Sequence, residues 1–287
     1  MILLRKQLSD APKTTESMSF MTNSENSSAH VKSVERAFLL VEALAHEPRE
    51  HSLTDLSKTL GWPKSTVHGL LSTLVQYRYA QQSEESGRYR LGVRFFELGA
   101  RMGGMSDIRS LALPSMQRLN RDLGEMVQLA TEDRGEVLYL EKLDSLHLIR
   151  IVSDIGRRLP LHCTGLGKAM LAYMPPSRVK QVIREHGLPA FTAKTITTIP
   201  ALEKELAEIR ARGFAMDDGE IMEGLRCIAA PIFDSRENVK YAVSVSAIQA
   251  NMSGERLEYA KKQVTAIASE ISKAIQSESI YSIGQRQ

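Results

Sequence analysis

Residues 52–78 constrain the fold more than any other part of the chain, because they have the pattern of two short helices joined by a tight turn. Ser52 is a good N-cap for the first helix, and Asp55 stands three residues later, where it can complete a capping box. Gly61 follows at a position that favours a left-handed residue. Pro63 is expected at the first position of the second helix, where its missing N–H leaves no hydrogen bond unmade.

The second helix has an apolar face and a polar face. Its apolar residues recur at helical spacing and predict a buried stripe made of Val67, Leu70, Leu71, Leu74 and Val75. The opposite face carries small polar or basic side chains, namely Lys64, Ser65, His68, Ser72, Thr73 and Gln76. Such a pair is typical of a helix-turn-helix, whose second helix presents hydrogen-bonding groups to DNA.

The charges of residues 56–83 also favour DNA binding. Residues 56–83 contain no Asp or Glu, but they contain Lys58, Lys64, His68 and Arg78. Phosphates repel carboxylates, and counterion release rewards cations, so a DNA-binding surface needs such a distribution. A solvated helix face usually mixes both signs. DNA binding is therefore favoured over a merely solvated face; a pair of helices that binds protein is a further alternative, and its binding would be insensitive to salt.

Another helix and a hairpin complete the N-terminal domain expected over residues 31–92. The helix has Ser33 as its predicted cap and an apolar stripe that would pack against the helix pair, formed by Val34, Ala37, Phe38, Val41, Leu44 and Ala45. Two short strands around a turn with Gly87 predict a β-wing. Arg88 and Arg90 share one face of this wing and could reach phosphate, although an ordinary hairpin with exposed arginines fits equally well.

Length and composition set wider bounds. A chain of 287 residues is long enough for two domains, and its net charge of +3 says little about partners. Two cysteines make neither a disulfide framework nor a metal cluster, which fits a reducing cytosol. No apolar run approaches the roughly 20 residues of a membrane span, and no secretory signal is recognisable. We expect a cytoplasmic protein without membrane contact, and nothing in the sequence indicates a metal or a cofactor.

The rest of the chain divides into four parts. Residues 1–30 are rich in Ser, Thr and Asn without periodicity and are expected to form a disordered tail. Residues 93–107 predict a linker helix, whose small apolar face would be covered by a helix of a second subunit or by its own domain. Residues 108–278 predict a second domain, and residues 279–287 a short tail.

The second domain combines strands in hairpins with separate helices. Strands are expected at residues 126–131, 136–142, 147–152, 227–233 and 239–248. Helices are expected at residues 110–123, 165–174, 177–186, 201–212 and 253–276. This order predicts an α+β domain on a mostly antiparallel sheet.

A glycine-rich turn at residues 164–168 opens one of these helices. It is not a phosphate loop, because Ala169 follows Lys168 and the required upstream glycine is missing. Its free N–H groups would suit a carboxylate, although the glycines would equally serve a close contact between helix and sheet.

On the last strand, Ser244 and Ser246 share one face and could bind a small polar ligand, or they could simply be small residues on a packed sheet. Cys227 is more often a small buried residue of this kind than a nucleophile. An enzyme, a small-molecule hydrolase that uses Cys227 and has an N-terminal docking module, is the alternative function.

Three long segments, residues 61–68, 155–169 and 223–234, make the sequence from about residue 31 to 278 resemble the IclR-type bacterial transcriptional regulators. The resemblance implies an N-terminal winged helix-turn-helix, a linker helix and a C-terminal GAF-like effector domain. It also implies a homodimer or a dimer of dimers on palindromic operator DNA. Such regulators often control carbon-source catabolism in response to a small carboxylic or sugar acid.

The resemblance carries over to particular residues. In the effector domain it implies that the backbone of Gly165 and Leu166 binds a carboxylate, and that the other contacts come from Ile151, Leu225, Cys227, Asp217, Ser244 and Ser246. On the DNA side, we expect contacts from Lys64, Ser65, Thr66, His68, Ser72 and Thr73, with Arg88 or Arg90 on the backbone. Gly69 departs from the family, which usually has arginine there, so a possible guanine- or phosphate-binding side chain is missing.

Overall fold

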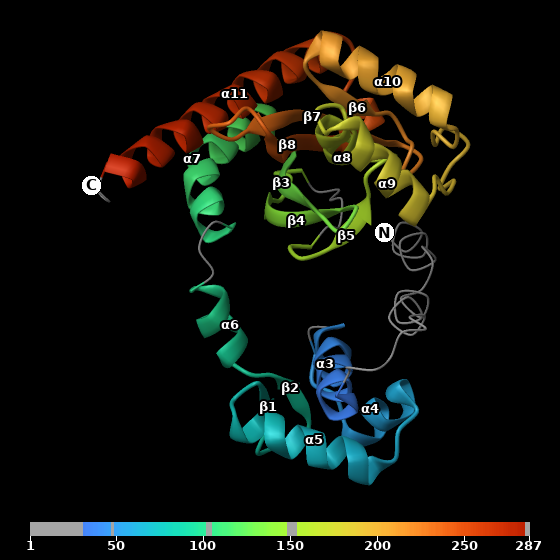
Figure 1. Cartoon of the computed structure of the whole chain (residues 1–287), viewed down its shortest axis with the longest axis vertical. Coiled ribbons are helices and arrows are strands. Elements are labelled where there is room, and N and C mark those ends of the chain that lie inside the picture. Colours follow the sequence, from blue (N-terminus) through green and yellow to red (C-terminus); the bar gives the residue numbers. More distant parts are fainter. Residues whose placement is uncertain (1–30, 47–48, 102–104, 148–153, 285–287) are drawn as a thin grey trace. The chain divides into compact units, whose positions relative to one another are not determined.

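The chain folds into two compact units, Met1–Arg101 and Met102–Gln287. The computed structural model describes residues 31–46, 49–101, 105–147 and 154–284 (Figure 1). The predicted tail at residues 1–30 and the predicted pocket residue Ile151 lie outside the described residues. Within the described part, no helix is long and apolar enough to cross a membrane.

The N-terminal unit is a winged helix-turn-helix. Its elements are α3 (Lys32–Ala45), α4 (Leu53–Leu60), α5 (Lys64–Gln76), β1 (Ala80–Gln82), β2 (Tyr89–Leu91) and α6 (Arg94–Gly99). Strands β1 and β2 pair antiparallel and form the wing. One core joins the three helices to the wing and is made of Leu40, Ala43, Leu44, Leu56, Val67, Leu71, Ala80 and Tyr89.

The local signals around the turn are present as predicted, with one shift. Ser52 Oγ accepts a hydrogen bond from the backbone N–H of Asp55 at 3.1 Å, and the Asp55 side chain accepts one from the Ser52 N–H, which completes the capping box. Gly61 has φ 67°, the left-handed conformation that ends α4. Pro63 precedes α5 as its N-cap, so the predicted first helical position belongs to Lys64.

Two predictions for α3 are wrong. The helix begins at Lys32 with Val31 as N-cap, so Ser33 lies inside it and caps nothing. The buried face is centred on Leu40, which the predicted stripe omitted, whereas Phe38 is 66% exposed. An apolar helix with hydrophobic residues on two sides allows both alignments, and only its packing against α4 and α5 decides between them.

The predicted linker helix at residues 93–107 is not one continuous helix. Helix α6 ends at Gly99, Ala100 and Arg101 form a turn, and residues 102–104 lie outside the described part of the chain. Helix α7 (Met105–Leu123) begins five residues before the predicted start at residue 110. A glycine in the last turn of a six-residue helix weakens it, which accounts for the early end of α6.

The second unit is built on an antiparallel sheet with the strand order β5-β4-β3-β8-β7-β6. The strands are β3 (Met126–Asp133), β4 (Glu136–Leu143), β5 (Arg158–Pro160), β6 (Ala215–Asp217), β7 (Leu225–Phe233) and β8 (Val239–Ile248). The α+β, GAF-like fold class is thus confirmed. The strand predicted at 147–152 is not seen, since His147 is in a bend and the rest lies outside the described residues. Strands β5 and β6 were missed, because three residues are too few to show a period.

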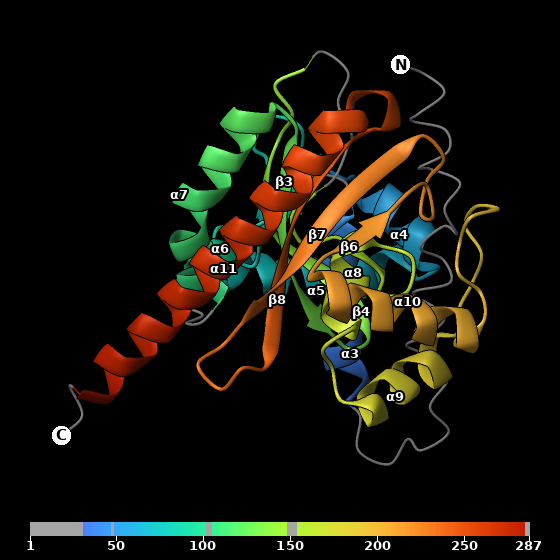
Figure 2. The same ribbon diagram turned by 90° about the horizontal axis from the view of Figure 1, so that it is seen from above.

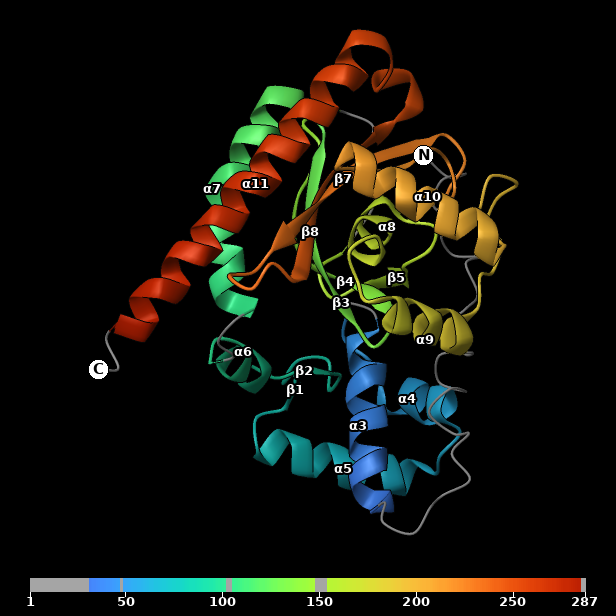
Figure 3. The same cartoon turned by 45° about the horizontal axis from the view of Figure 1, so that its top comes forward.

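Helices cover both faces of this sheet (Figure 3). On one face, α7 lies alongside α11 (Gly254–Gly284), as Figure 2 also shows. On the other lie α8 (Gly165–Leu171), α9 (Pro176–His186) and α10 (Ile199–Arg212). The predicted tail at residues 279–287 is helical as far as Gly284, because α11 is longer than predicted.

Successive side chains of β8 point to opposite faces of the sheet, and those on one face are apolar while those on the other include two serines. Val243 and Val245 belong to the core under α7 and α11. Ser244 and Ser246 therefore point to the opposite face, which α8 covers. The small polar residues are thus buried beneath a helix rather than exposed to solvent.

Two glycines near the turn should respond to alanine in opposite directions. Gly69 is in the interior of α5 and a Cβ there would meet nothing within 4 Å, so Gly69→Ala should stabilise the unit by about 1 kcal/mol. Gly61 also has open space but a left-handed backbone, so Gly61→Ala should destabilise it by about 1 kcal/mol. Trp62, the single tryptophan of the sequence, reports unfolding of this unit in urea. Equal effects of both variants would contradict the assignment.

Candidate nucleic-acid interface and effector pocket

The polar face of α5 is open to solvent. Lys64, Ser65 and His68 are all exposed, and Thr66 is half-buried. The helix is held from beneath by Val67 and Leu71, which are fully buried. Since no carboxylate occurs in residues 56–83, this surface can approach a polyanion without a like-charge penalty.

Two of the predicted DNA-contacting hydroxyls are already hydrogen-bonded within the helix. Ser72 Oγ donates to the carbonyl oxygen of His68 at 2.9 Å, and Thr73 Oγ1 donates to that of Gly69 at 3.1 Å. Both residues are exposed, and each hydroxyl keeps lone pairs for a further contact. They can therefore accept hydrogen bonds, whereas Ser65 is better placed to donate one.

The two wing arginines differ in their surroundings. Arg88 Nη1 donates to the backbone oxygen of Glu50 at 3.4 Å. Arg90 Nη2 donates to the amide oxygen of Gln81 at 3.2 Å. Neither arginine has an ion-pair partner among the described residues, but Arg88 also interacts electrostatically with the Asp55 carboxylate, so Arg90 is the better candidate for a phosphate contact.

In the second unit, three predicted pocket residues form one row across three strands. Asp217 of β6 stands opposite Cys227 of β7, which stands opposite Ser246 of β8. Directly paired residues share a face of an antiparallel sheet. A Cβ on Gly165 would lie 3.4 Å from the Cβ of Cys227, so the start of α8 rests on the middle of this row.

The remaining predicted residues lie around that row. Leu225 is on the same face of β7 as Cys227, two residues away, and Leu166 is buried in the first turn of α8. Ser244 faces Gln128 of β3 across the next pair of strands. The fold therefore brings together every predicted effector residue that it describes.

Gln128 is a member of this site that the sequence analysis missed. Its side-chain oxygen accepts hydrogen bonds from Ser246 Oγ at 3.0 Å and from Ser244 Oγ at 3.5 Å. Both hydroxyl groups therefore donate their hydrogen to the same amide oxygen, and their own oxygen atoms can still accept hydrogen bonds. A single polar residue inside the apolar run of β3 was the available signal.

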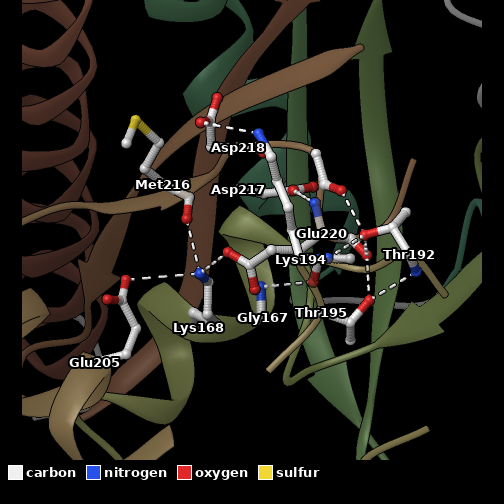
Figure 4. Close-up of polar contacts among 12 residues, drawn as sticks. Gly167, Lys168, Thr192, Lys194, Thr195, Glu205, Met216, Asp217, Asp218 and Glu220 are labelled. Carbon is white, nitrogen blue, oxygen red and sulfur yellow. Dashed lines mark hydrogen bonds and ion pairs between the residues drawn. The ribbon is translucent and has the colours of Figure 1, made fainter. Parts of the chain in front are cut away.

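Lys168 is the second residue that the sequence analysis did not assign. It is 1% exposed, and its ammonium donates to the carbonyl oxygen of Met216 at 2.7 Å and to the carboxylate of Glu220 (Figure 4). Glu205 of α10 lies 3.6 Å from the same nitrogen and is also paired with Arg212 at 2.7 Å. This ammonium therefore joins α8, α10 and the segment after β6.

Asp217 lies beside this cluster and is fully buried. Its Oδ1 accepts the backbone N–H of Glu220 at 2.6 Å, whereas its Oδ2 has no hydrogen-bond partner among the described residues. Burial raises the pKa of Asp217 to about 7, and the amides of Glu220 and Ile221 offset this only in part. The carboxyl group is thus poised to exist in either form near neutral pH.

Neither Cys163 nor Cys227 has the lowered pKa of an activated, nucleophilic thiol. Burial raises the pKa of both Cys163 and Cys227, which keeps them as thiols. His162 has its Nε2 against the carbonyl oxygen of Pro189 at 3.0 Å and so is engaged elsewhere. Among the described residues no group of His, Cys, Asp and Glu could hold a metal ion.

The two glycines of the turn at residues 164–168 have different reasons to be glycine. A Cβ on Gly167 would overlap the backbone of Leu161, so that position requires a close approach of two chain segments. Gly165 has only ordinary van der Waals neighbours. Thr164 Oγ1 accepts the N–H of Gly167 at 3.1 Å and caps the helix.

A separate cavity of about 80 Å³ lies between α9 and the end of β5. Apolar side chains dominate its walls, and His162 and His186 are its two histidines. It does not include Asp217, Cys227 or Ser246, and the first turn of α8 is not part of its walls. The row beneath α8 is the better candidate for the effector site.

Comparison with known proteins assigns both units. The family described as "IclR helix-turn-helix domain" matches residues 33–84, and that described as "Bacterial transcriptional regulator IclR C-terminal" matches residues 102–273. The chain belongs to the IclR family.

Individual IclR-family relatives match over most of their length. The regulator XynR of Escherichia coli is 33% identical over 245 residues, which cover 85% of this chain and 97% of that protein. The regulator KdgR of the same organism is 38% identical over 228 residues, 79% of this chain and 86% of the relative. The crystal structure of an IclR homologue from Microbacterium hydrocarbonoxydans, complexed with 4-hydroxybenzoate, has a TM-score of 0.77 at 25% identity and covers 85% of this chain and 99% of its own.

The buried carboxyl group of Asp217 should make the free energy of unfolding of this IclR-family protein depend on pH. Because the folded pKa of Asp217 is raised to about 7 from 3.8, the folded state holds a proton between these values that the unfolded state has lost. Wild-type stability should therefore fall as pH rises through this window, by up to about 1.4 kcal/mol per pH unit. In Asp217→Asn that part of the slope should vanish, as measured by urea unfolding between pH 5 and 7.5.

Asp218→Asn is the matched control, since this neighbouring carboxylate is already paired with Arg226. It should retain the wild-type slope. Parallel curves for wild type and Asp217→Asn would show that Asp217 does not titrate in this range.

Proposed function

We propose that this IclR-family protein is a ligand-responsive, DNA-binding regulator that controls a catabolic operon in response to a small carboxylic or sugar acid. The observation that carries the proposal is the exposed polar face of α5, on which Lys64, Ser65 and His68 are free of neighbouring carboxylates. We infer that α5 enters the major groove, with Thr66 at its edge and Arg90 of the wing on the backbone. Such a protein acts in the cytoplasm, where the bacterial chromosome lies.

A palindromic operator and a dimer, or a dimer of dimers, belong to the same proposal. The N-terminal unit has apolar side chains in solvent on two helices, including Phe96 of α6 at 77% exposure and Phe38 of α3. We infer that these exposed aromatic side chains contribute to the contact with a second subunit. A second subunit that covers them would place two α5 helices on the two halves of a symmetric site.

The effector site that we propose lies beneath the start of α8. The N–H groups of Gly165 and Leu166 have no hydrogen-bond partner among the described residues, and Gly165 packs against Cys227 in the row that contains Asp217, Cys227 and Ser246. Backbone donors of a first helical turn suit a carboxylate, and the side chains of the row suit hydroxyl groups. The homologue bound to 4-hydroxybenzoate, an acid with a hydroxyl group, supports this ligand class.

Gel-shift titration with the DNA upstream of the gene and of its neighbours tests the whole proposal. An acid can alter operator affinity only as far as it binds two arrangements of the protein with different affinity. We expect a sequence-specific shift that at least one acid of a panel strengthens or weakens. No shift in the presence or absence of any acid would count against the proposal.

Lys64→Ala should weaken binding to all DNA sequences alike. Loss of one phosphate contact reduces the slope of log K against log salt concentration by about 0.9 for each bound subunit. Lys204→Ala is the matched control, because Lys204 is a highly exposed lysine of α10 in the other unit and its removal changes net charge equally. Fluorescence anisotropy between about 50 and about 200 mM salt measures the slope for both variants. An unchanged slope for Lys64→Ala would remove this residue from the interface.

Cys227→Ser separates the regulator from the hydrolase. A nucleophilic cysteine needs a lowered pKa and a nearby base, whereas burial raises the pKa of Cys227 and its sheet neighbours are Asp217 and Ser246. We expect Cys227→Ser to change acid affinity, as measured by thermal shift, with no turnover by wild type or variant on ester substrates. Turnover that the substitution abolishes would establish the enzyme instead.

A further inference from the structure

A buried carboxyl group without a counter-ion stands out in the effector domain. Asp217 has 0% exposure. Its Oδ1 accepts the Glu220 N–H at 2.6 Å, and its Oδ2 lacks a hydrogen-bond partner among the described residues. An ionised carboxylate in such a place carries a large desolvation penalty, which protonation removes.

The nearby cations are already paired with other carboxylates. Lys168 contacts Glu220 and Glu205, and Arg212 contacts Glu205. The two cations and the two carboxylates of this cluster therefore neutralise one another, and neither cation forms an ion pair with Asp217. On the other side, Lys194 and Arg226 both pair with Asp218.

The other titratable groups that face Asp217 are neutral. They are Cys227 on β7, Tyr139 on β4 and Cys163 before α8, and burial raises the pKa of each, which keeps all three protonated. The nearest charged carboxylate is Glu220, whose own negative charge further disfavours ionisation of Asp217. An incoming acid anion would add to this repulsion.

We propose that the effector site binds one acid anion together with one proton, which Asp217 takes up from solvent and donates through Oδ2 to the bound ligand. The inference rests on the proposed function, in that an acid occupies the row formed by Asp217, Cys227 and Ser246. A neutral carboxyl group both removes the repulsion and supplies the O–H donor that an anionic ligand can accept. Its unpartnered oxygen is the atom that is free to do so.

Proton uptake makes effector affinity depend on pH with a definite sign. The pKa of Asp217 in the free protein is about 7, so the binding-competent, protonated form dominates below that pH and declines above it. The apparent Kd is the intrinsic Kd divided by the competent fraction. It should rise about tenfold between pH 6 and pH 8 and about tenfold for each further pH unit.

Isothermal titration calorimetry on the full chain tests the inference, with lactate, gluconate and 4-hydroxybenzoate as probes. These carboxylic acids stay ionised at pH 6 to 8 and so contribute no proton of their own. At pH 8, titrations in phosphate and in Tris differ in enthalpy by the number of protons bound times the difference in buffer ionisation enthalpy. We expect close to one proton per ligand for the wild type.

Two variants test whether Asp217 is the group that takes up the proton. Asp217→Asn is isosteric and permanently neutral, and its amide can donate as the acid does, so it should bind with nearly equal affinity at all pH values and take up no proton. Asp218→Asn, the adjacent carboxylate with its own cations, should keep the wild-type pH dependence and proton count.

The possible failures are distinct. Binding by the wild type with constant affinity and no proton uptake would overturn the inference and leave the proposed function intact. Proton uptake that persists in Asp217→Asn would likewise overturn it, since another group would then be responsible. If none of the acids binds at any pH, both the inference and the acid-responsive part of the proposed function fail.

Discussion

The buried ammonium of Lys168 is the interaction on which the effector domain depends. It connects α8 with α10 and with the segment that carries Asp217, because it donates to Met216 and Glu220 and lies 3.6 Å from the carboxylate of Glu205. A charge at 1% exposure is tolerable only with its partners in place, and removal of one partner of such a pair costs about 3–5 kcal/mol. The same contact that stabilises the helix therefore fixes the first turn of α8 over β7 and the turn after β6 beside it.

The DNA-binding unit could be predicted from the sequence because its signals are local. Ser52 and Asp55 cap α4 across three residues, Gly61 supplies the left-handed turn, and the apolar spacing of α5 determines which face is exposed. Each depends on neighbours within one or two helical turns. Even here α3 shows the limit, since two of its faces are apolar and only contacts with α4 and α5 select Leu40 over Phe38.

The effector domain could be predicted only in part, because its candidate site is assembled from distant segments. Asp217 was assigned to the pocket through the family resemblance, whereas Ser246 was already indicated by the alternation along the last strand. Lys168 gave no such signal, and Gln128 gave only the weak one of a single polar residue in an apolar run. A lysine four residues into a helix normally lies in solvent, and what makes Lys168 internal is Glu220, 52 residues away, which no periodicity reveals. Likewise Gln128 gains its role from two serines more than a hundred residues later.

The size of the expected regulatory effect is compatible with a single contact in this site. A tenfold change in operator affinity requires that the effector bind one arrangement of the protein about 1.4 kcal/mol more tightly than the other. A hydrogen bond to a charged group contributes about 1.5–3 kcal/mol. One bond from Asp217 to an acid, present in one arrangement and absent in the other, is therefore sufficient. In the proposed mechanism the exposed face of α5 needs no change of its own, and only the placement of two such helices in a dimer has to respond.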